Sequence, residues 1–207
     1  MLAFSSLLGN VEGQNIYRIW YDKPASYWEE ALPVGNGRIA AMVFGDPQLE
    51  QIQLNEETVS AGSPYQNYNE EAKTALPEMR RLIFEGKYEE AQNMAATKIL
   101  SQVGNEMPYQ TVGRLNIRYQ DHKKVNNYYR DLDISNAVAV TRYEVDGVEF
   151  TEETFASFTD QLVIRHIKAS KPGAINCELF FNTPMRDPKR SIYGKKGLRL
   201  EGITHGS

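Results

Sequence analysis

The chain has 207 residues, of which 41% are hydrophobic and 24% charged, and its formal net charge is −4. This length suits one large domain or two small ones, with enough apolar residues for a sizeable core. The acidic balance and the shortness of every basic cluster argue against a nucleic-acid partner, which usually needs a basic stripe. Cys177 is the single cysteine, so an internal disulfide and a thiolate metal site are excluded.

The three histidines are far apart in sequence and lack the spacing of metal ligands. We therefore expect neither a metal nor a cofactor. Cys177 stands in the alternating run AINCELFF, where we expect a small buried side chain.

The chain begins with the segment MLAFSSLLGNVEGQ, residues 1–14, which differs in texture from the rest. It is apolar and rich in small residues, like the end of a secretory signal peptide, although it has no basic region before it. We interpret residues 1–14 as a signal-peptide remnant or a disordered tail, which predicts a secreted or periplasmic protein. No apolar run approaches the ~18 residues of a membrane-spanning helix, so no membrane span is expected.

Residues 15–55 have a strand-like pattern, with IYRIWY, RIAAMVFG and LEQIQLN as separate runs. Between the first two lies GNGRIA, Gly35 to Ala40, which satisfies the loose dinucleotide-binding pattern G-x-G-x-x-G/A. A nucleotide site would need a strand before the glycines and a crossover helix after them. Pro33 disfavours a central strand, and the run from Ile39 to Phe44 is too short for that helix. The glycines therefore predict a turn between two antiparallel segments.

The middle of the chain is helical in pattern. Asn69 is expected to cap the first helical stretch, Pro77 to lie in a first helical turn, and Gly86 to end the helix. KYEEAQNMAATKIL begins a second helix. We predict a two-helix insertion around residues 70–101.

After Gly104 the pattern returns to strands at a spacing of roughly ten residues, with turn residues between them. Asp146-Gly147 joins two alternating runs and is a strong hairpin signal, because both positions tolerate positive φ. DQLVIRHIKAS and INCELFF read as further strands, whereas RDPKRSIYGKKGLRLEG is polar and ends in the start of one more strand. The predicted fold is mainly β, an antiparallel β-sandwich.

Several segments, in order, resemble the N-terminal domain of glycoside hydrolase family 95, the α-L-fucosidases. They are YDKPASYWEEALPVGNGRIAAMVFG, IQLNEETV, AGSP, LPEMRRLIFEGKYEEAQ, MPYQTVGRLNIRY, YYRDLDISNAVAVTRYEVDGVEF and FASFTDQLVIRHIKASKPGAI. The resemblance covers residues 17–184. It implies a β-sandwich of the super-sandwich type over residues 15–207, placed before a helical catalytic barrel that this chain lacks.

The resemblance also implies an inverting hydrolysis of terminal α-L-fucosyl or related α-galactosyl linkages by the full-length enzyme, with a Glu acid and an activated water. The catalytic groups would lie beyond residue 207, so no catalytic residue is assigned here. The implied partners are the missing barrel of the same polypeptide and, through the full-length enzyme, an oligosaccharide.

Four residues are candidates for the substrate side or an interdomain contact: Trp28, Asn36, Asn55 and Glu56. Asn55 and Glu56 follow a strand, where polar groups can line a cleft, although structural hydrogen bonding explains them as well. Trp28 stands in a loop between two prolines and suits either a sugar-facing ring or plain packing.

The leading functional hypothesis is a non-catalytic N-terminal domain of a fucosidase-type hydrolase. The alternative is a stand-alone module that binds carbohydrate or another protein.

Overall fold

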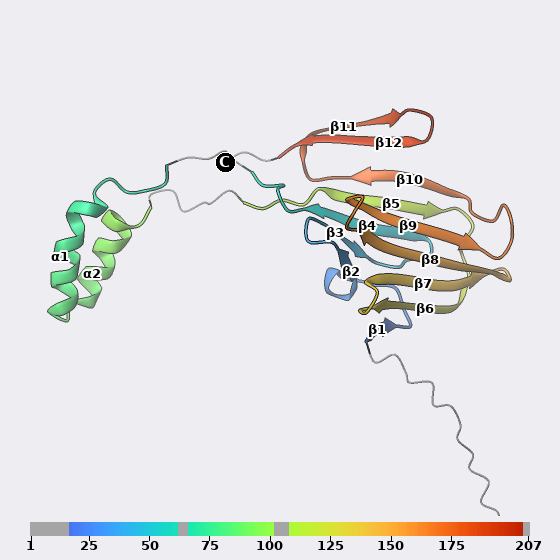
Figure 1. The fold of residues 1–207 in the computed structure, drawn as a ribbon, viewed down its shortest axis with the longest axis horizontal. Coiled ribbons are helices and arrows are strands. Elements are labelled where there is room, and N and C mark those ends of the chain that lie inside the picture. The colour runs from blue at the N-terminus through green and yellow to red at the C-terminus, as the bar shows by residue number, and fades with distance from the viewer. Residues whose placement is uncertain (1–16, 62–65, 102–107, 205–207) are drawn as a thin grey trace, which may run out of the picture. The chain divides into compact units, whose positions relative to one another are not determined.

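The computed structural model describes residues 17–61, 66–101 and 108–204, and their elements fall into two units (Figure 1). One unit holds the described residues up to Val59 together with Thr111–Ile203 and contains the named strands. The other is built around Ser60–Gln110 and contains the helices. The segment interpreted as a signal-peptide remnant, residues 1–14, lies outside the described residues.

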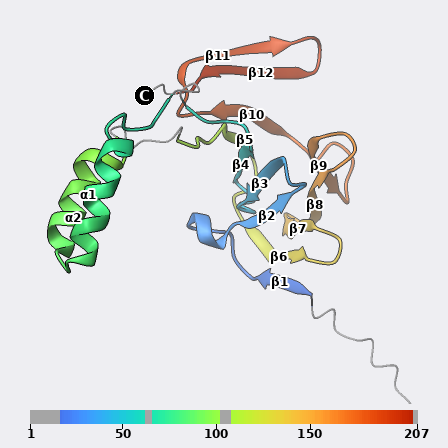
Figure 2. The ribbon, with the colours of Figure 1, turned by 60° about the vertical axis from the view of Figure 1, so that its left-hand side comes forward.

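Two five-stranded antiparallel sheets form the first unit. Sheet A has the order β1-β6-β7-β8-β9, with bounds Arg18–Tyr21, Val125–Asp133, Val138–Val145, Val148–Ser157 and Leu162–Ala169. Sheet B has the order β10-β5-β4-β3-β2, with bounds Cys177–Asn182, Gly113–Tyr119, Leu49–Glu56, Ile39–Val43 and Leu32–Gly35. The hairpin of β11 (Arg186–Tyr193) and β12 (Gly197–Ile203) is a separate two-stranded sheet. The predicted antiparallel sandwich is confirmed, and Figure 2 shows sheets A and B as two layers.

The glycine motif is the predicted turn. β2 and β3 pair antiparallel, with Gly35 opposite Ala40, and Gly37 has a φ of 94°, which favours glycine. Pro33 lies in β2, which is an edge strand, so its missing N–H need not deprive the sheet of a hydrogen bond.

The Asp146-Gly147 hairpin is confirmed as well. β7 and β8 pair up to Val145 opposite Val148, and the two linking residues have φ values of 49° and 76°. Positive φ at both positions matches the right-handed twist of the flanking strands.

The core lies between the two sheets. Side chains along β3, β4, β5 and β7 point alternately inward and outward. The inward-pointing side chains of these strands contribute to one apolar cluster. The fully buried members of this cluster are Leu32, Val34, Ala41, Val43, Ile52, Ile117, Tyr119, Leu132 and Ala139.

Three local predictions were wrong. The polar stretch after Pro184 forms two strands instead of one, and every residue of β11 is exposed, so β11 shows no apolar alternation to reveal it. Cys177 is only half-buried, because it lies on β10 at the edge of sheet B. Pro77 lies inside a helix and not in its first turn.

The helical unit contains α1 (Ala72–Phe84) and α2 (Tyr88–Met94), which continues into the π-helical turn η2 (Ala95–Ile99). Pro77 is the sixth of the 13 residues of α1, so its missing N–H deprives the helix of one backbone hydrogen bond without ending it. Gly86, with a φ of 77°, ends α1 as predicted. Asn69 accepts a hydrogen bond from the N–H of Glu71, just before α1, and donates to the carbonyl of Thr97.

Candidate functional site

Asn36 organises the turn between β2 and β3. Its Oδ1 accepts hydrogen bonds from the backbone N–H groups of Arg38 and Ile39, at 3.0 and 2.9 Å. Its Nδ2 donates to the carbonyl of Ser157, at 2.8 Å, at the end of β8. Asn36 therefore joins the β2–β3 turn of sheet B to the β8–β9 turn of sheet A.

Glu56 lies beside this turn at the end of β4, opposite Ile39. Its carboxylate accepts hydrogen bonds from the hydroxyl and the N–H of Thr58 and from Nε of Arg38, the last at 2.9 Å. The Thr58 hydroxyl, followed by Arg38, lowers the pKa of Glu56 to about 2. A carboxyl held ionised in this way is a poor general acid, since glycosidase acids have a raised pKa.

The other two candidates have fewer contacts. Asn55 is half-buried opposite Ala40, and its Oδ1 accepts the N–H of Glu56, at 3.0 Å. Trp28 lies in the 3-10 turn η1 (Trp28–Glu30), which precedes β2, with 52% of its surface exposed. The structure thus brings Asn36 and Glu56 together through Arg38, with Asn55 next to Glu56. Trp28 belongs to the segment that enters β2 at its other end.

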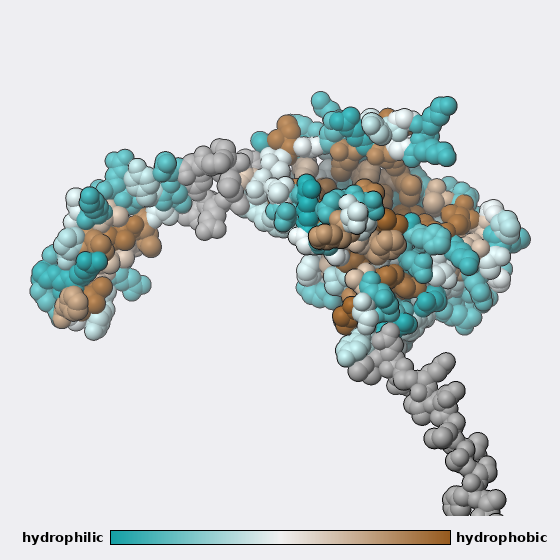
Figure 3. Space-filling model, viewed as in Figure 1, coloured by the Kyte–Doolittle hydropathy of each residue, from teal (hydrophilic) through white to brown (hydrophobic). Residues whose placement is uncertain are grey.

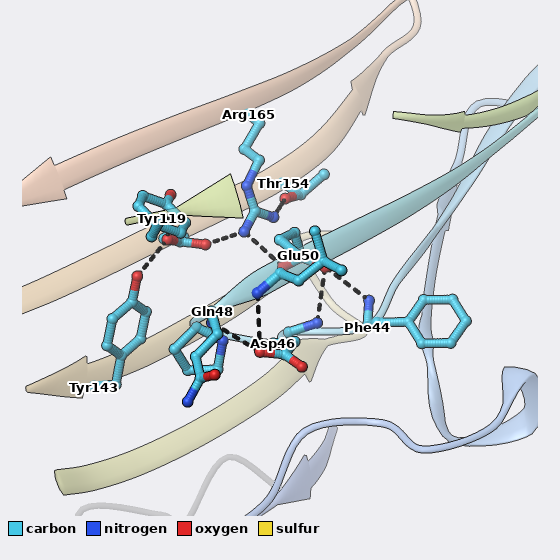
Figure 4. Close-up of polar contacts among 12 residues, drawn as sticks. Phe44, Asp46, Gln48, Glu50, Tyr119, Tyr143, Thr154 and Arg165 are labelled. Carbon is cyan, nitrogen blue, oxygen red and sulfur yellow. Dashed lines mark hydrogen bonds and ion pairs between the residues drawn. The ribbon is translucent and has the colours of Figure 1, made fainter. Parts of the chain in front are cut away.

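A buried ionic cluster, which was not predicted from the sequence, lies between the two sheets (Figure 4). Arg165 on β9 forms ion pairs with Glu50 on β4, at 2.7 Å, and with Glu152 on β8. The two glutamate side chains are 0% and 1% exposed, and the arginine side chain is 7% exposed. Arg165 thereby links sheet A to sheet B through the interior.

Backbone and phenol groups complete the coordination of these carboxylates. Glu50 Oε1 accepts the N–H groups of Phe44 and Gly45, at 3.1 and 2.9 Å. Glu152 Oε1 accepts the hydroxyls of Tyr119 and Tyr143, at 2.6 and 2.7 Å. Each buried carboxylate therefore has several donors, as a buried charge requires.

Burial is the main cause of the pKa shifts within this cluster. Burial raises the pKa of Glu50, with Arg165 opposing the shift. Burial, followed by the charge of Glu152, raises the pKa of Tyr119 and of Tyr143. Because both glutamates are closed off from solvent, this arrangement holds the two sheets together and offers no open acid–base pair to a substrate.

The sequence did carry a signal for this cluster. Glu50 lies two and four residues before the inward-facing Ile52 and Leu54, so it is on the same face of β4. Arg165 lies on the same face of β9 as Val163 and Ile167. A charged residue on the apolar row of a strand indicates a buried ion pair.

Two absences concern the described residues. Among residues 17–61, 66–101 and 108–204, no group of three His, Cys, Asp or Glu side chains could hold a metal ion. Within the same ranges, no helix is both long and apolar enough to cross a membrane.

A pocket of about 240 Å³ opens where β4, β5 and β10 come together. Arg114 and Gln53 line it from β5 and β4, and Asn182 lines it from the end of β10. Gly113, with a φ of 135°, lets the start of β5 pass so close to the Asn182 carbonyl that a Cβ atom would collide with it.

Comparison with known proteins agrees with the fold. Residues 19–206 match the family model described as glycosyl hydrolase family 65, N-terminal domain. Alpha-L-fucosidase 2 from Arabidopsis thaliana is 37% identical over 181 residues, which is 84% of this chain and 21% of that protein. Probable alpha-fucosidase A from Aspergillus niger is 26% identical over 162 residues, which is 73% of this chain and 20% of that protein.

Probable alpha-fucosidase A from Aspergillus oryzae is 25% identical over 174 residues, 79% of this chain and 23% of that protein. The chain thus spans about a fifth of the length of the curated relatives it matches. The resemblance to the N-terminal domain of a family 95-like enzyme is confirmed, and the chain belongs to the family of glycosyl hydrolase family 65 N-terminal domains.

Proposed function

We propose that this chain is the non-catalytic N-terminal domain of a longer, fucosidase-type inverting glycoside hydrolase. One observation carries the proposal: the chain matches an N-terminal domain family over residues 19–206 and about a fifth of each fucosidase relative. The domain packs on a catalytic helical barrel of the same polypeptide, and the secreted or periplasmic enzyme acts in carbohydrate metabolism.

The carboxylates of the described residues support a non-catalytic role. An inverting hydrolase needs an acid and a water-activating group about 6.5–9.5 Å apart across an open site. Glu50 and Glu152 are brought together by Arg165, but both are sealed inside the sandwich. Glu56 is accessible but bound by Arg38 and Thr58, which keep it ionised.

The proposed reaction belongs to the full-length enzyme. Its barrel supplies the acid and the activated water for release of a terminal α-L-fucosyl or related α-galactosyl unit from an oligosaccharide. The turn of Asn36, Arg38 and Glu56 presents the exposed Arg38 side chain to a neighbouring domain or the substrate, and the pocket beside Arg114 offers a second contact site.

The complete gene product tests the reaction class. It is assayed with aryl α-L-fucoside, α-galactoside and α-glucoside, and the first sugar product is followed by proton NMR. We expect turnover of the fucoside or the galactoside, with the β-anomer appearing first. Turnover of the glucoside alone, or an α-anomer as first product, would contradict the proposal.

A stand-alone carbohydrate-binding module is the second candidate, and one aromatic pair favours it. Trp20 on β1 is 60% exposed and stacks on Tyr129 with ring centroids 6.2 Å apart. Flat exposed rings of this kind can bind a sugar face. This candidate predicts that fucosylated oligosaccharides change the tryptophan fluorescence of the 207-residue chain, and that Trp20→Ala, but not Trp28→Ala, abolishes the change.

A further inference from the structure

Sheets A and B are offset from one another, which leaves part of sheet B uncovered. β2 packs against β6, β7 and β8, and β3 packs against β8 and β9. Sheet A ends at β9, whereas sheet B continues beyond β3 through β4 and β5 to β10. Arg165 and Val163 of β9 reach the core in front of β4 and β5. The inner face of β10 therefore lies past the last strand of sheet A.

The inner face of β10 is apolar and open. The register with β5 places Leu179 opposite Ile117 and Phe181 opposite Leu115, so both side chains belong to the inward row. Ile117 is 3% exposed, whereas Leu179 is 47% exposed. The inward-facing side chains of sheet B are thus buried on β5 but exposed on the neighbouring strand β10.

The β11–β12 hairpin forms the second wall of this open region. A groove of about 340 Å³ runs between β10 and the hairpin, lined from β10 by Leu179, Phe180 and Phe181 and from the hairpin by Arg190, Ser191, Ile192, Leu198 and Arg199. Ile192 is 80% exposed. Figure 3 shows apolar surface gathered along β10 beneath the hairpin.

β9 presents a regular free edge at the end of sheet A. Among the described strands it pairs with β8 alone, without a register shift from Phe150–Ala169 to Ser157–Leu162. Ser170 N donates to Glu149 O in the same register. Because antiparallel pairing alternates, the N–H and C=O groups of Val163, Arg165, Ile167 and Ala169 point away from β8. A long, regular edge of this kind is a template for another strand.

We propose that a β-strand of the same polypeptide, following residue 207, pairs with the free edge of β9 and covers the inner face of β10. The inference rests on the proposed function, in which this domain belongs to a longer enzyme. The matched relatives are about five times as long as the part that aligns, so they have chain to spare for such a strand. A strand in the same chain also has a high effective concentration at this edge.

The groove defines the chemistry of the strand. Up to eight residues can pair along β9, with alternate apolar side chains against Leu179 and Phe181. The hairpin segment 186–203 carries six basic and two acidic residues. Arg199 already pairs with Glu201 at 2.8 Å, so acidic side chains at the edge of the new strand would complement Arg190 and the remaining basic excess.

Hydrogen exchange followed by NMR tests the inference. Backbone amides are compared between the 207-residue chain and the complete gene product. We expect the N–H groups of Val163, Arg165, Ile167 and Ala169 to exchange at least about a hundredfold more slowly in the longer protein, because they gain strand partners. The amides of Ile164, His166 and Lys168, which face β8, should be protected in both proteins.

A matched pair of variants keeps the test sharp. Leu179→Lys places a charge on the inner face of β10, and Ile134→Lys places the same charge in the turn between β6 and β7, away from β10. Both should leave the 207-residue chain folded, since both sites are exposed. In the complete gene product, only Leu179→Lys should restore fast exchange along the β9 edge.

Unprotected β9 amides in a complete gene product that hydrolyses fucosides would overturn the inference and leave the proposed function standing. Protected amides in a product without glycosidase activity would support the inference and overturn the proposed function. Protection that rises with the concentration of the 207-residue chain, together with a dimer mass, would overturn the inference by making a second copy the occupant.

Discussion

At the scale of single residues, charges that face inward decide how firmly the two sheets are joined. Glu50 and Glu152 share one guanidinium, that of Arg165, in a region closed to water. The tyrosine hydroxyls and two backbone N–H groups supply the remaining hydrogen bonds. Such a cluster contributes little when intact but is costly to break, because removing one partner leaves a buried charge without a counter-ion.

Arg165→Met should therefore reduce the free energy of unfolding by about 3–5 kcal/mol. The control is Arg118→Met, because Arg118 forms an exposed ion pair with Glu178 at 2.9 Å and its loss should cost less than about 1 kcal/mol. Urea denaturation of the two variants measures the difference. Equal losses would show that the buried cluster has no special role.

Glu56 gives a prediction with a definite pH range. Its pKa is lowered from 4.5 to about 2 in the folded chain. A lowered pKa stabilises the fold fully above the unfolded value, and the contribution disappears as pH falls through the folded value. The stability difference between the wild-type chain and Glu56→Gln should be largest above about pH 5 and shrink steadily toward pH 2. A difference that does not vary with pH would contradict the pairing of Glu56 with Arg38 and Thr58.

For single residues, the sequence indicates which polar side chains stand out but not which hydrogen-bond or ion-pair partners they have. Asn36 and Glu56 were selected as substrate-side or interdomain candidates, and in the structure their hydrogen bonds close a turn and hold two strands. The buried ion pair of Arg165 and Glu50 was not predicted, although each residue interrupts the apolar face of its strand. Pairing across 115 residues of sequence depends on the packing of the sheets, which local alternation does not determine.

At the scale of elements, turns are the parts that sequence chemistry predicts most directly. Gly37 and the Asp146-Gly147 pair need positive φ, and both lie in the expected turns. β11 was missed because an exposed strand has no apolar row, and the helix through Pro77 was misplaced because one lost backbone bond does not end a helix. Edge and surface elements are therefore harder to predict from the sequence than core strands, because their apolar pattern is weaker.

The β2–β3 turn offers a prediction about how the sheets are joined. Asn36→Ala removes two hydrogen bonds inside the turn and two to the β8–β9 turn, at Ser157 and Gln161, so the free energy of unfolding should fall by about 1–3 kcal/mol. Asn55→Ala is the matched control, with one local bond to Glu56 N and an expected loss under about 1 kcal/mol. Chemical denaturation checks both. A larger loss for Asn55→Ala would reverse the roles assigned to the two side chains.

At the scale of the whole molecule, the helical unit is an insertion in the sandwich. Ser60 and Tyr109 form a bridge at its base, which brings the two ends of the insertion together. The chain enters the unit after β4 and leaves it before β5, and these two strands pair directly. Among the described residues, the buried members of the core cluster all belong to strands β2 to β7.

Replacing residues 60–110 with a short Gly/Ser linker should therefore leave the sandwich folded. We expect the β-type circular dichroism spectrum to remain and the thermal midpoint to change by no more than about 2–4 °C, the effect of roughly 1 kcal/mol in a domain of about 150–250 residues. Loss of cooperative unfolding would show that the helices are part of the sandwich core.

The central claim is that the chain supports a glycosidase without performing its chemistry. The most direct measurement is the rate of aryl α-L-fucoside hydrolysis by the purified 207-residue chain, beside that of the complete gene product at equal molar concentration. The account predicts no turnover above the buffer background for the 207-residue chain and multiple turnovers for the complete product. Hydrolysis by the 207-residue chain that rises in proportion to its concentration and survives repeated purification would contradict it.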